Sequence, residues 1–338
     1  MKQLTVTEAV AAADKNADVH AHVILDQKLK LSQSSATPSN ERLTSSPSKL
    51  SDMYVIIKGD RAAIRKASRR MTPGGRADVL VASRNQLEGV INQTSELSAS
   101  DKQILIRDVH MIHCIPFGNE MEVPTFQCFY QFTKNSLFFD QHADMVFLYP
   151  STSIQEKKRR QKHLKLFTTF PDLDLRLQGQ MDMRDGDKMF EVKNRMWAPE
   201  DMDDKYRWAA HAQILVYLWM ASLSRAYQEP MGYLVEHHRT GEGVMLKIEY
   251  REGDVKSVFT ENYQPKVLDD ITVRVGTRNA GVMIITKYSS EQAASFYEED
   301  FLPGLKKFAN MWDGLVEDPS LRRTYENCAS RPAFYADH

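Results

Sequence analysis

The sequence has few cysteines and no long hydrophobic run. Its three cysteines, Cys114, Cys128 and Cys328, are too few and too scattered for a disulfide framework. They also cannot supply the set of thiolates that an iron–sulfur cluster usually needs. No apolar stretch approaches the roughly 20 residues of a membrane span, and the N-terminus lacks the apolar region of a secretion signal. We therefore expect an intracellular protein, in the cytoplasm or nucleus, that has no membrane partner.

An excess of charge of either sign is also missing. The 44 lysines and arginines nearly balance the 45 aspartates and glutamates, and the formal net charge is -1. The chain as a whole is therefore not a polycation, and any binding to nucleic acid has to come from local basic patches. The length of 338 residues permits one large domain or two smaller ones with a sizeable core.

The N-terminal part of the chain divides into two segments by composition. Residues 1–31 contain an alanine- and leucine-rich stretch at 7–30, which predicts a helix with Thr7 as its N-cap. Residues 32–52 are rich in serine, threonine and proline and predict a flexible linker, because such a segment buries little apolar surface. The main domain is then expected over residues 53–338.

Within the main domain, predicted helices alternate with predicted strands. Residues 101–150 mix apolar and aromatic segments, which indicates strands with connecting helices. The other expected elements are a short strand at 53–57, helices at 60–71, 76–93, 203–227 and 264–275, strands at 232–238 and 244–250, an apolar segment at 281–288 and a helix from 290 onward. This alternation is typical of an α/β or α+β fold with a mixed central sheet flanked by helices.

The stretch QGQMDMRDGDKMFEVKNR, residues 178–195, places acids and a lysine among apolar residues. Its Asp185-Gly186 pair is a strong signal for a two-residue hairpin turn. Such a turn would pair Arg184 with Asp187. The stretch therefore predicts two antiparallel strands whose register can be counted back from the turn.

This register gathers the charged residues on one face of the hairpin. Counting back sets Asp182 opposite Met189 and Gln180 opposite Glu191. Because side chains alternate along a strand, Asp182, Glu191 and Lys193 are expected to share one face. The opposite, core-facing side is expected to carry Met181, Met183, Phe190 and Val192.

Two carboxylates held so close repel each other unless a cation lies between them. Hard divalent cations such as Mg²⁺ and Mn²⁺ prefer oxygen ligands. A cation held in this way polarises a phosphoryl oxygen and activates a bound water, and a neighbouring lysine can orient that water. The pattern therefore indicates phosphodiester hydrolysis. The alternative is a solvated hairpin whose acids pair with lysines.

A helix predicted after the hairpin carries a second part of the pattern. Gln213 and Tyr217 are four residues apart and share a helix face, although a helix that merely borders the core would look the same. The ordered set Asp182-x8-Glu191-Val192-Lys193 and Gln213-x3-Tyr217 resembles the PD-(D/E)XK nuclease superfamily, most of all its RecB and lambda-exonuclease-like branch. FEVKNR also resembles the corresponding strand of herpesvirus-type alkaline exonucleases. The resemblance covers residues 176–220.

The resemblance implies a restriction-endonuclease-like core and a metal-dependent nuclease. The implied substrate is DNA, cleaved exonucleolytically in recombination, repair or replication. Further implied partners are a second copy of the chain or proteins of replication and recombination. The implied metal, Mg²⁺ or Mn²⁺, would be held by Asp182, Glu191, the carbonyl of Val192 and an upstream glutamate, while Lys193 positions the attacking water and Gln213 and Tyr217 contact the phosphate or order the site.

Glu88 in SRNQLEGVINQ is the best match to that upstream glutamate. The long gap to Asp182 would make residues 100–170 an insertion, and Asp140 and Asp144 are rival acids. Two other interpretations remain open. One is a nucleic-acid-binding or scaffold protein that has a nuclease fold but does not cleave, and the other is an RNA endonuclease of the same superfamily.

Two basic patches are candidates for phosphate contacts. Arg61, Arg65 and Arg69 recur every four residues in a predicted helix and form a stripe. The second patch is Lys157, Lys158, Arg159 and Arg160. For either patch alone, a solvated surface is the slightly better explanation.

A zinc site is a further hypothesis, suggested by His110, His113 and Cys114, with Cys128 downstream. In the expected strand, residues three apart face opposite ways, which argues against it.

Overall fold

The structure, a computed structural model, describes most of the chain. The described residues are 1–13, 21–31, 73–133, 145–147, 162–196, 198–199, 204–239, 243–258 and 265–337. Both predicted basic patches lie outside them: Arg61, Arg65, Arg69, Lys157, Lys158, Arg159 and Arg160. Asp140, Asp144 and the predicted linker at 32–52 also lie outside the described residues. These interpretations stay predictions.

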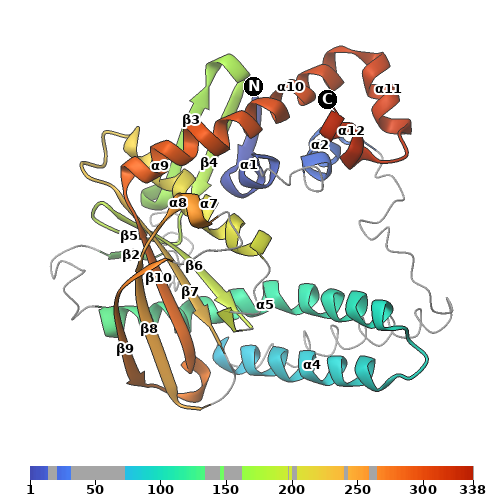
Figure 1. The fold of residues 1–338 in the computed structure, drawn as a ribbon. Coiled ribbons are helices and arrows are strands. Elements are labelled where there is room, and N and C mark those ends of the chain that lie inside the picture. Colours follow the sequence, from blue (N-terminus) through green and yellow to red (C-terminus); the bar gives the residue numbers. More distant parts are fainter. Residues whose placement is uncertain are drawn as a thin grey trace.

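A seven-stranded mixed sheet forms the centre of the fold, with the strand order β2–β5–β6–β7–β10–β8–β9 (Figure 1). Its parallel neighbours are β6 with β7 and β8 with β10, and the other neighbours are antiparallel. The protein is therefore mixed α and β, as predicted. The strands are Met145–Phe147 (β2), Met183–Asp185 (β5), Lys188–Arg195 (β6), Met231–His238 (β7), Met245–Glu252 (β8), Lys266–Arg274 (β9) and Gly281–Tyr288 (β10).

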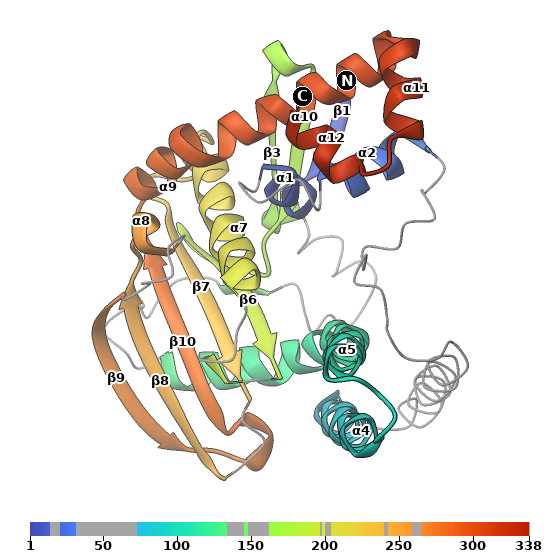
Figure 2. The ribbon, with the colours of Figure 1, turned by 45° about the vertical axis from the view of Figure 1, so that its right-hand side comes forward.

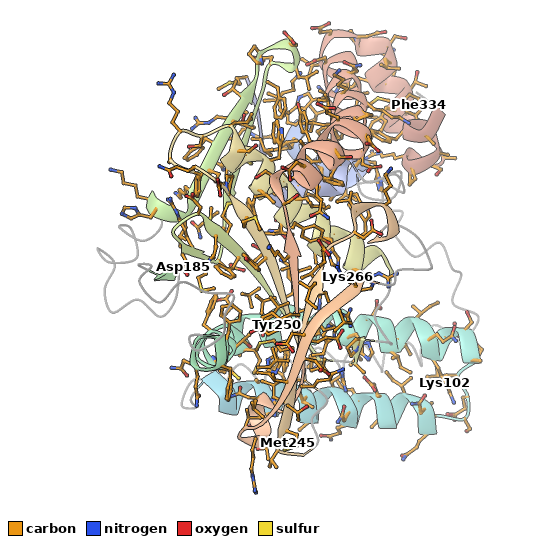
Figure 3. All side chains as sticks on the ribbon, turned by 60° about the vertical axis from the view of Figure 1, so that its left-hand side comes forward. Lys102, Asp185, Met245, Tyr250, Lys266 and Phe334 are labelled. Atoms are coloured by element: carbon orange, nitrogen blue, oxygen red, sulfur yellow. The ribbon has the colours of Figure 1, made fainter. Side chains whose placement is uncertain are left out.

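Helices cover both faces of this sheet near β6. Helix α7, Asp204–Ser222, connects the parallel strands β6 and β7 and packs on one face, because parallel neighbours need a crossover connection. Helix α5, Ala99–Thr133, packs on the other face (Figure 2). Aromatic side chains such as Phe129, Phe190 and Tyr250 fill the layer on the α5 side, where Figure 3 labels Tyr250. β6 therefore lies between two apolar layers.

A smaller sheet of three strands lies beside the large one. Its order is β1–β4–β3, with β1 parallel to β4 and β3 antiparallel to β4. The strands are Lys2–Thr5 (β1), Lys165–Phe170 (β3) and Leu175–Gln180 (β4). One face is buried in the core through Leu4, Leu166, Leu175 and Leu177. β4 leads directly into β5, so the two sheets meet at residues 181–182.

The N-terminal segment packs against the C-terminal helices (Figure 1). The predicted helix at 7–30 is described as α1, Val6–Ala13, and α2, Ala21–Leu29. Asp26 of α2 is buried, where it forms an ion pair with Arg331 and accepts a hydrogen bond of 3.2 Å from Tyr325 Oη. The C-terminal segment, predicted as one helix from residue 290, comprises Ser290–Phe296 (α9), a π-helical turn at Tyr297–Phe301, Leu302–Glu317 (α10), Pro319–Asn327 (α11) and Arg331–Asp337 (α12).

The strands predicted within residues 101–133 are wrong, because this part of the chain is the single helix α5. Its buried residues recur every four positions at Leu105, Val109, His113, Phe117 and Met121, which is the spacing of one helix face. Its Pro116 and Pro124 lie inside the helix and obscured this spacing. The helix predicted at 76–93 is confirmed as α4, Pro73–Gln93, and it packs along α5.

The argument against zinc at His110 and His113 also fails, because the two residues lie on a helix. Both side chains have protein partners: His110 Nε2 lies 2.5 Å from Glu88 Oε1, and His113 Nε2 lies 3.0 Å from Ser83 Oγ. The described residues contain no group of three or more histidines, cysteines or acids that could hold a metal.

The helix predicted at 264–275 is likewise wrong, and the structure shows the edge strand β9 there. Val267, Ile271 and Val273 are β-branched, a type of side chain that fits a pleated strand better than a helix. Pairing with β8 along the whole strand decides the outcome. The apolar segment at 281–288 is β10, between β7 and β8.

Candidate active site

The predicted hairpin is present, but its turn lies one residue later than predicted. Asp185 pairs with Lys188, so Gly186 and Asp187 form the turn in place of Asp185-Gly186. Gly186 has a φ of 56°, and a two-residue turn of type II′ requires glycine at this first position. Opposite residues are therefore shifted by two positions from the predicted register, and an even shift leaves every side chain of β6 on its predicted face.

Glu191 and Lys193 share one face of β6, as predicted, but that face is covered by protein. Glu191 is only 4% exposed, and Met189 on the same face is buried in the cluster that contains α7. Met181 belongs to this cluster too, which corrects its predicted place on the opposite face, because the chain is irregular where β4 passes into β5. The opposite face carries Met183, Phe190 and Val192.

Asp182 lies in the short connection between β4 and β5 and points toward β6. Its Oδ2 accepts a hydrogen bond of 2.9 Å from the backbone N–H of Val192. This bond holds the Asp182 carboxylate beside the strand that carries Glu191. The two acids predicted to act together are therefore brought together. The Val192 carbonyl, predicted as a further metal ligand, stays a prediction.

Lys193 connects the hairpin with helix α7. Its Nζ donates to Glu191 Oε1 at 2.6 Å and to Gln213 Oε1 at 2.9 Å. Gln213 Nε2 in turn donates to Tyr217 Oη at 3.2 Å, and Tyr217 Oη donates to the backbone carbonyl of Gln180 at 3.1 Å. The predicted helix face of Gln213 and Tyr217 thus faces the predicted hairpin face.

The Tyr217 ring reaches this position because β4 carries a glycine beneath it. A Cβ atom at Gly179 would lie 2.3 Å from Tyr217 Cε1, closer than two carbon atoms can approach. The close approach lets Tyr217 contact the strand just before Asp182. The glycine is therefore required by the side-chain network of the site rather than by a turn.

The network borders a cavity of about 460 Å³. Asp182, Glu191, Gln213 and Tyr217 line it from the hairpin and α7. The small sheet and its connection to α1 supply the other walls, through Thr5, Val6, Thr7, Lys165, Phe167, Gln178, Gly179 and Gln180. The cavity is large enough for a phosphate group and several waters, since a water occupies about 30 Å³ in the liquid.

Burial and mutual repulsion shift the acids of the site toward their neutral forms. Burial and, next, the negative charge of Asp182 together raise the pKa of Glu191 to about 8, and Lys193 opposes the shift only in part. Burial also raises the pKa of Asp182, against the charge of Lys193 and the hydrogen bond from Val192. The pKa of Tyr217 lies well above its usual value because of burial and the nearby Glu191 charge, so its hydroxyl keeps its proton.

The donor set of this cavity fits a hard divalent cation. Glu191 Oε2 is buried and has no hydrogen-bond partner among the described residues, although buried oxygens normally have one. A cation between Asp182 and Glu191 would satisfy this oxygen and remove the repulsion between the carboxylates. The site offers two carboxylates, which suits Mg²⁺ because that ion keeps several waters and takes few protein ligands.

Glu88, predicted to complete the metal site, lies on α4 and is not among the residues that line the cavity. Its Oε1 lies 2.5 Å from His110 Nε2 and 3.2 Å from Arg84 Nε. These contacts give Glu88 a structural role, because they link α4 to α5.

Sequence reasoning missed two charged residues near the site. Glu122 of α5 lies close enough for its charge to raise the pKa of Glu191. Lys165 of β3 lines the cavity and contributes a positive charge. Reading residues 101–133 as one helix would have placed Glu122 on an upstream helix, which is the position that Glu88 was chosen to fill.

Comparison with known proteins adds no further identification. No protein-family model, curated protein or solved structure matches this chain. The resemblance to PD-(D/E)XK nucleases therefore depends on the residues of the site and on the order of the elements that carry them. None of the helices in the described part of the chain is long and apolar enough to cross a membrane.

Proposed function

We propose that this protein is a divalent-metal-dependent nuclease of the PD-(D/E)XK type that hydrolyses phosphodiester bonds, with DNA as its substrate. The observation that carries the proposal is the buried Glu191, which lines one cavity with Asp182. One of its carboxylate oxygens has no hydrogen-bond partner among the described residues, and the other accepts a hydrogen bond from Lys193. A buried carboxylate that bonds a lysine through only one of its two oxygens is unusual for a purely structural ion pair, because such a pair would normally satisfy every buried oxygen.

The order of the elements supports the same assignment. Asp182 comes just before the hairpin β5–β6, which carries Glu191 and Lys193. Helix α7 carries Gln213 and Tyr217 across the same face, and β7 returns parallel to β6. The sequence pattern has the same order: a strand aspartate, an E-x-K strand and a Q-x-x-x-Y helix. We propose that β5, β6, α7 and β7 form a restriction-endonuclease-like core.

Asp182 and Glu191 would hold the cation. When bound, Mg²⁺ or Mn²⁺ would supply Lewis-acid polarisation of the phosphoryl oxygen and lower the pKa of a water. Asp182 is fixed for this role by its hydrogen bond from Val192.

Lys193 would position the attacking water and stabilise negative charge on the phosphate. An ammonium has three N–H donors, and Lys193 directs two of them at Glu191 and Gln213. Its third donor remains for a water or a phosphate oxygen. Gln213 and Tyr217 act through Lys193 as positioning residues, because their hydrogen bonds fix the lysine against the helix.

Cleavage is expected to require a divalent cation and to return when Mg²⁺ or Mn²⁺ is added after EDTA treatment. The reason is that the two carboxylates repel each other and bind substrate phosphate poorly without a cation. Single- and double-stranded DNA and RNA, labelled at either the 5′ or the 3′ end, would reveal substrate class, polarity and mode of attack. An Asp182→Asn preparation purified in parallel controls for contaminating nucleases. Undiminished cleavage in EDTA would exclude this mechanism, and binding without cleavage under all metals would favour the non-cleaving alternative.

Gln213→Ala is expected to lower turnover about ten- to a hundredfold, because a hydrogen bond to a charged group contributes about 1.5–3 kcal/mol. The loss should appear in kcat rather than KM, since the role proposed for Gln213 is to orient Lys193. Tyr217→Phe is the matched control: it keeps the packed ring, loses one hydroxyl and should have a smaller effect. A variant that unfolds at lower temperature but retains full specific activity would show that Gln213 is structural.

A further inference from the structure

The outward face of the small sheet is polar and continuous with the candidate active site. Strand pairing aligns alternate residues of β1, β4 and β3 on this face, opposite the buried leucines. Its strand positions carry amides, hydroxyls, two cations and one aromatic ring, and none of them is acidic: Gln3, Thr5, Lys165, Phe167, Thr169, Arg176, Gln178 and Gln180. β4 runs along this face toward Asp182, so the face leads into the catalytic cavity.

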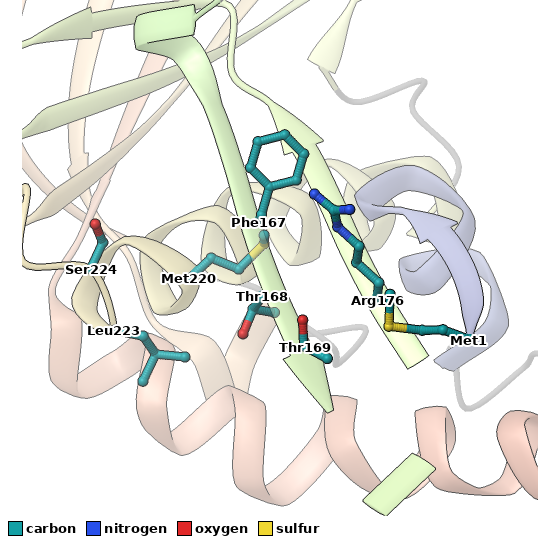
Figure 4. A pocket seen from close by; sticks show the side chains of 8 residues that line it. All are labelled: Met1, Phe167, Thr168, Thr169, Arg176, Met220, Leu223 and Ser224. Carbon is teal, nitrogen blue, oxygen red and sulfur yellow. The ribbon is translucent and has the colours of Figure 1, made fainter. Parts of the chain in front are cut away.

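Phe167 differs from the buried aromatic residues of the core because the residue is 50% exposed. It lines the cavity that contains Asp182 and Glu191 and also a second cavity of about 480 Å³ on its other side. Figure 4 shows this second cavity, with Phe167 and Arg176 on neighbouring strands. The Arg176 guanidinium lies 4.7 Å from the centre of the Phe167 ring, so an aromatic surface and a positive charge are presented together.

A structural role does not explain this ring. Phe170, on the same strand but on the opposite face, stacks on Trp219 at 5.7 Å between ring centres and belongs to the core layer. Phe167 has no such aromatic partner among the described residues, and Arg176 contacts it from the side of the sheet. Phe167 is thus an exposed aromatic ring with cations on both sides along the sheet, Lys165 toward the catalytic cavity and Arg176 toward the second one.

We infer that the polar face of β1, β4 and β3 binds single-stranded nucleic acid and delivers it to the catalytic cavity. Phe167 stacks on an unpaired base, and Arg176 and Lys165 contact phosphates on either side of it. An exposed ring flanked by cations is the arrangement by which proteins bind single strands, since every base has a face on which an aromatic side chain can stack. A duplex buries those faces between its own base pairs. The inference rests on the proposed nuclease function and names the substrate class of that site.

Binding can be tested without cleavage, by fluorescence anisotropy of a labelled single-stranded oligonucleotide with the full chain in EDTA. Phe167→Ala is expected to weaken this binding about 5- to 150-fold, the range measured for loss of one base-stacking contact. Phe167→Trp should bind as tightly as the wild type. Arg176→Gln should flatten the dependence of log K on log salt by about 0.7, the value for one phosphate contact with a single strand.

Leu223→Ala is the matched control, because Leu223 is 59% exposed and lines the second cavity but has no aromatic surface. Its binding should equal that of the wild type, and all variants should unfold at the same temperature because Phe167 and Leu223 are exposed and Arg176 is only partly buried. Tighter binding of a duplex than of the single strand, or a Phe167→Ala variant that binds the single strand normally, would overturn the inference. The two proposals fail separately: binding without metal-dependent cleavage contradicts the nuclease function, and cleavage without a Phe167 effect contradicts only the single-strand site.

Discussion

Lys193→Ala is expected to lower cleavage while the binding of Mg²⁺ or Mn²⁺ is retained or strengthened. The substitution removes a positive charge that lies 2.6 Å from Glu191, so a cation beside the carboxylates no longer meets that repulsion. The attacking water and the phosphate lose their donor at the same time. Removal of one such electrostatic group lowers the rate on the order of 10²–10³-fold. Calorimetric titration of the metal and a cleavage assay on the same preparation would measure both quantities.

Two further variants test whether the effect of Lys193→Ala belongs to Lys193 itself. Asp182→Asn should lose metal affinity and cleavage together, while asparagine still accepts the hydrogen bond from Val192 and keeps the fold. Lys247→Ala is the matched control, because Lys247 bonds Glu249 two residues away on a strand at 2.9 Å but lies outside the cavity. Its cleavage should be unchanged. Normal cleavage by Lys193→Ala, or normal metal binding by Asp182→Asn, would show that the roles are assigned wrongly.

The local periodicity of the sequence was sufficient to bring Asp182, Glu191, Lys193, Gln213 and Tyr217 together in one network, four of which line the cavity. Alternation along β6 places Glu191 and Lys193 together, and four-residue spacing places Gln213 and Tyr217 on one side of α7. The misplaced turn did not change these faces, because a shift of the pairing register by two positions leaves each side chain on the same face of the strand. What the sequence could not predict was burial. The hairpin face looked solvent-exposed, but α7 and the small sheet cover it, and those contacts join residues far apart along the chain.

The mistakes outside the site have the same origin in long-range packing. In α5, the apolar residues are numerous enough to resemble strands, and only the burial of every fourth residue reveals the helix. In β9, pairing with β8 determines the structure of a segment that was predicted as a helix. The error in α5 also affected the predicted site. Because residues 101–133 were expected to form strands, Glu122 was not considered as an upstream acid, and Glu88 was preferred.

The burial of Glu191 has an energetic consequence for the metal-free protein. One carboxylate oxygen has lost water and gained no hydrogen bond among the described residues, and Asp182 lies beside it. Such a group destabilises the folded state, and a cation that binds only the folded state would offset this effect. The Glu191 carboxylate therefore lowers the stability of the metal-free protein, although the proposed function requires it. This difference allows the site to be tested without a substrate.

Glu191→Gln is expected to abolish cleavage and to stabilise the metal-free protein, by about 1–3 kcal/mol at pH 8 or above, the cost of one unsatisfied buried group. The pKa of Glu191 is about 8 in the folded state against an ordinary value of 4.5. The folded protein therefore binds more protons than the unfolded chain between these values, and the wild type loses stability as the pH rises through this window. The advantage of the variant should be absent below about pH 4.5, grow through the window and level off above it. Chemical denaturation in EDTA at several pH values would measure it.

Glu236→Gln provides a matched control with the opposite sign. Glu236 is also buried, on the neighbouring strand β7, but it accepts a hydrogen bond of 3.2 Å from Arg195. Burial acts to raise its pKa, yet the charge of Arg195, followed by those of His211 and His238, brings the pKa below its usual value. Its replacement should therefore destabilise the protein at neutral pH. Saturating Mn²⁺ should raise the stability of the wild type and leave the stability of Glu191→Gln nearly unchanged. The difference in stability between the two proteins should then shrink or change sign. If both variants are less stable than the wild type at pH 8 in EDTA, Glu191 is a satisfied structural acid and the cation site loses its main support.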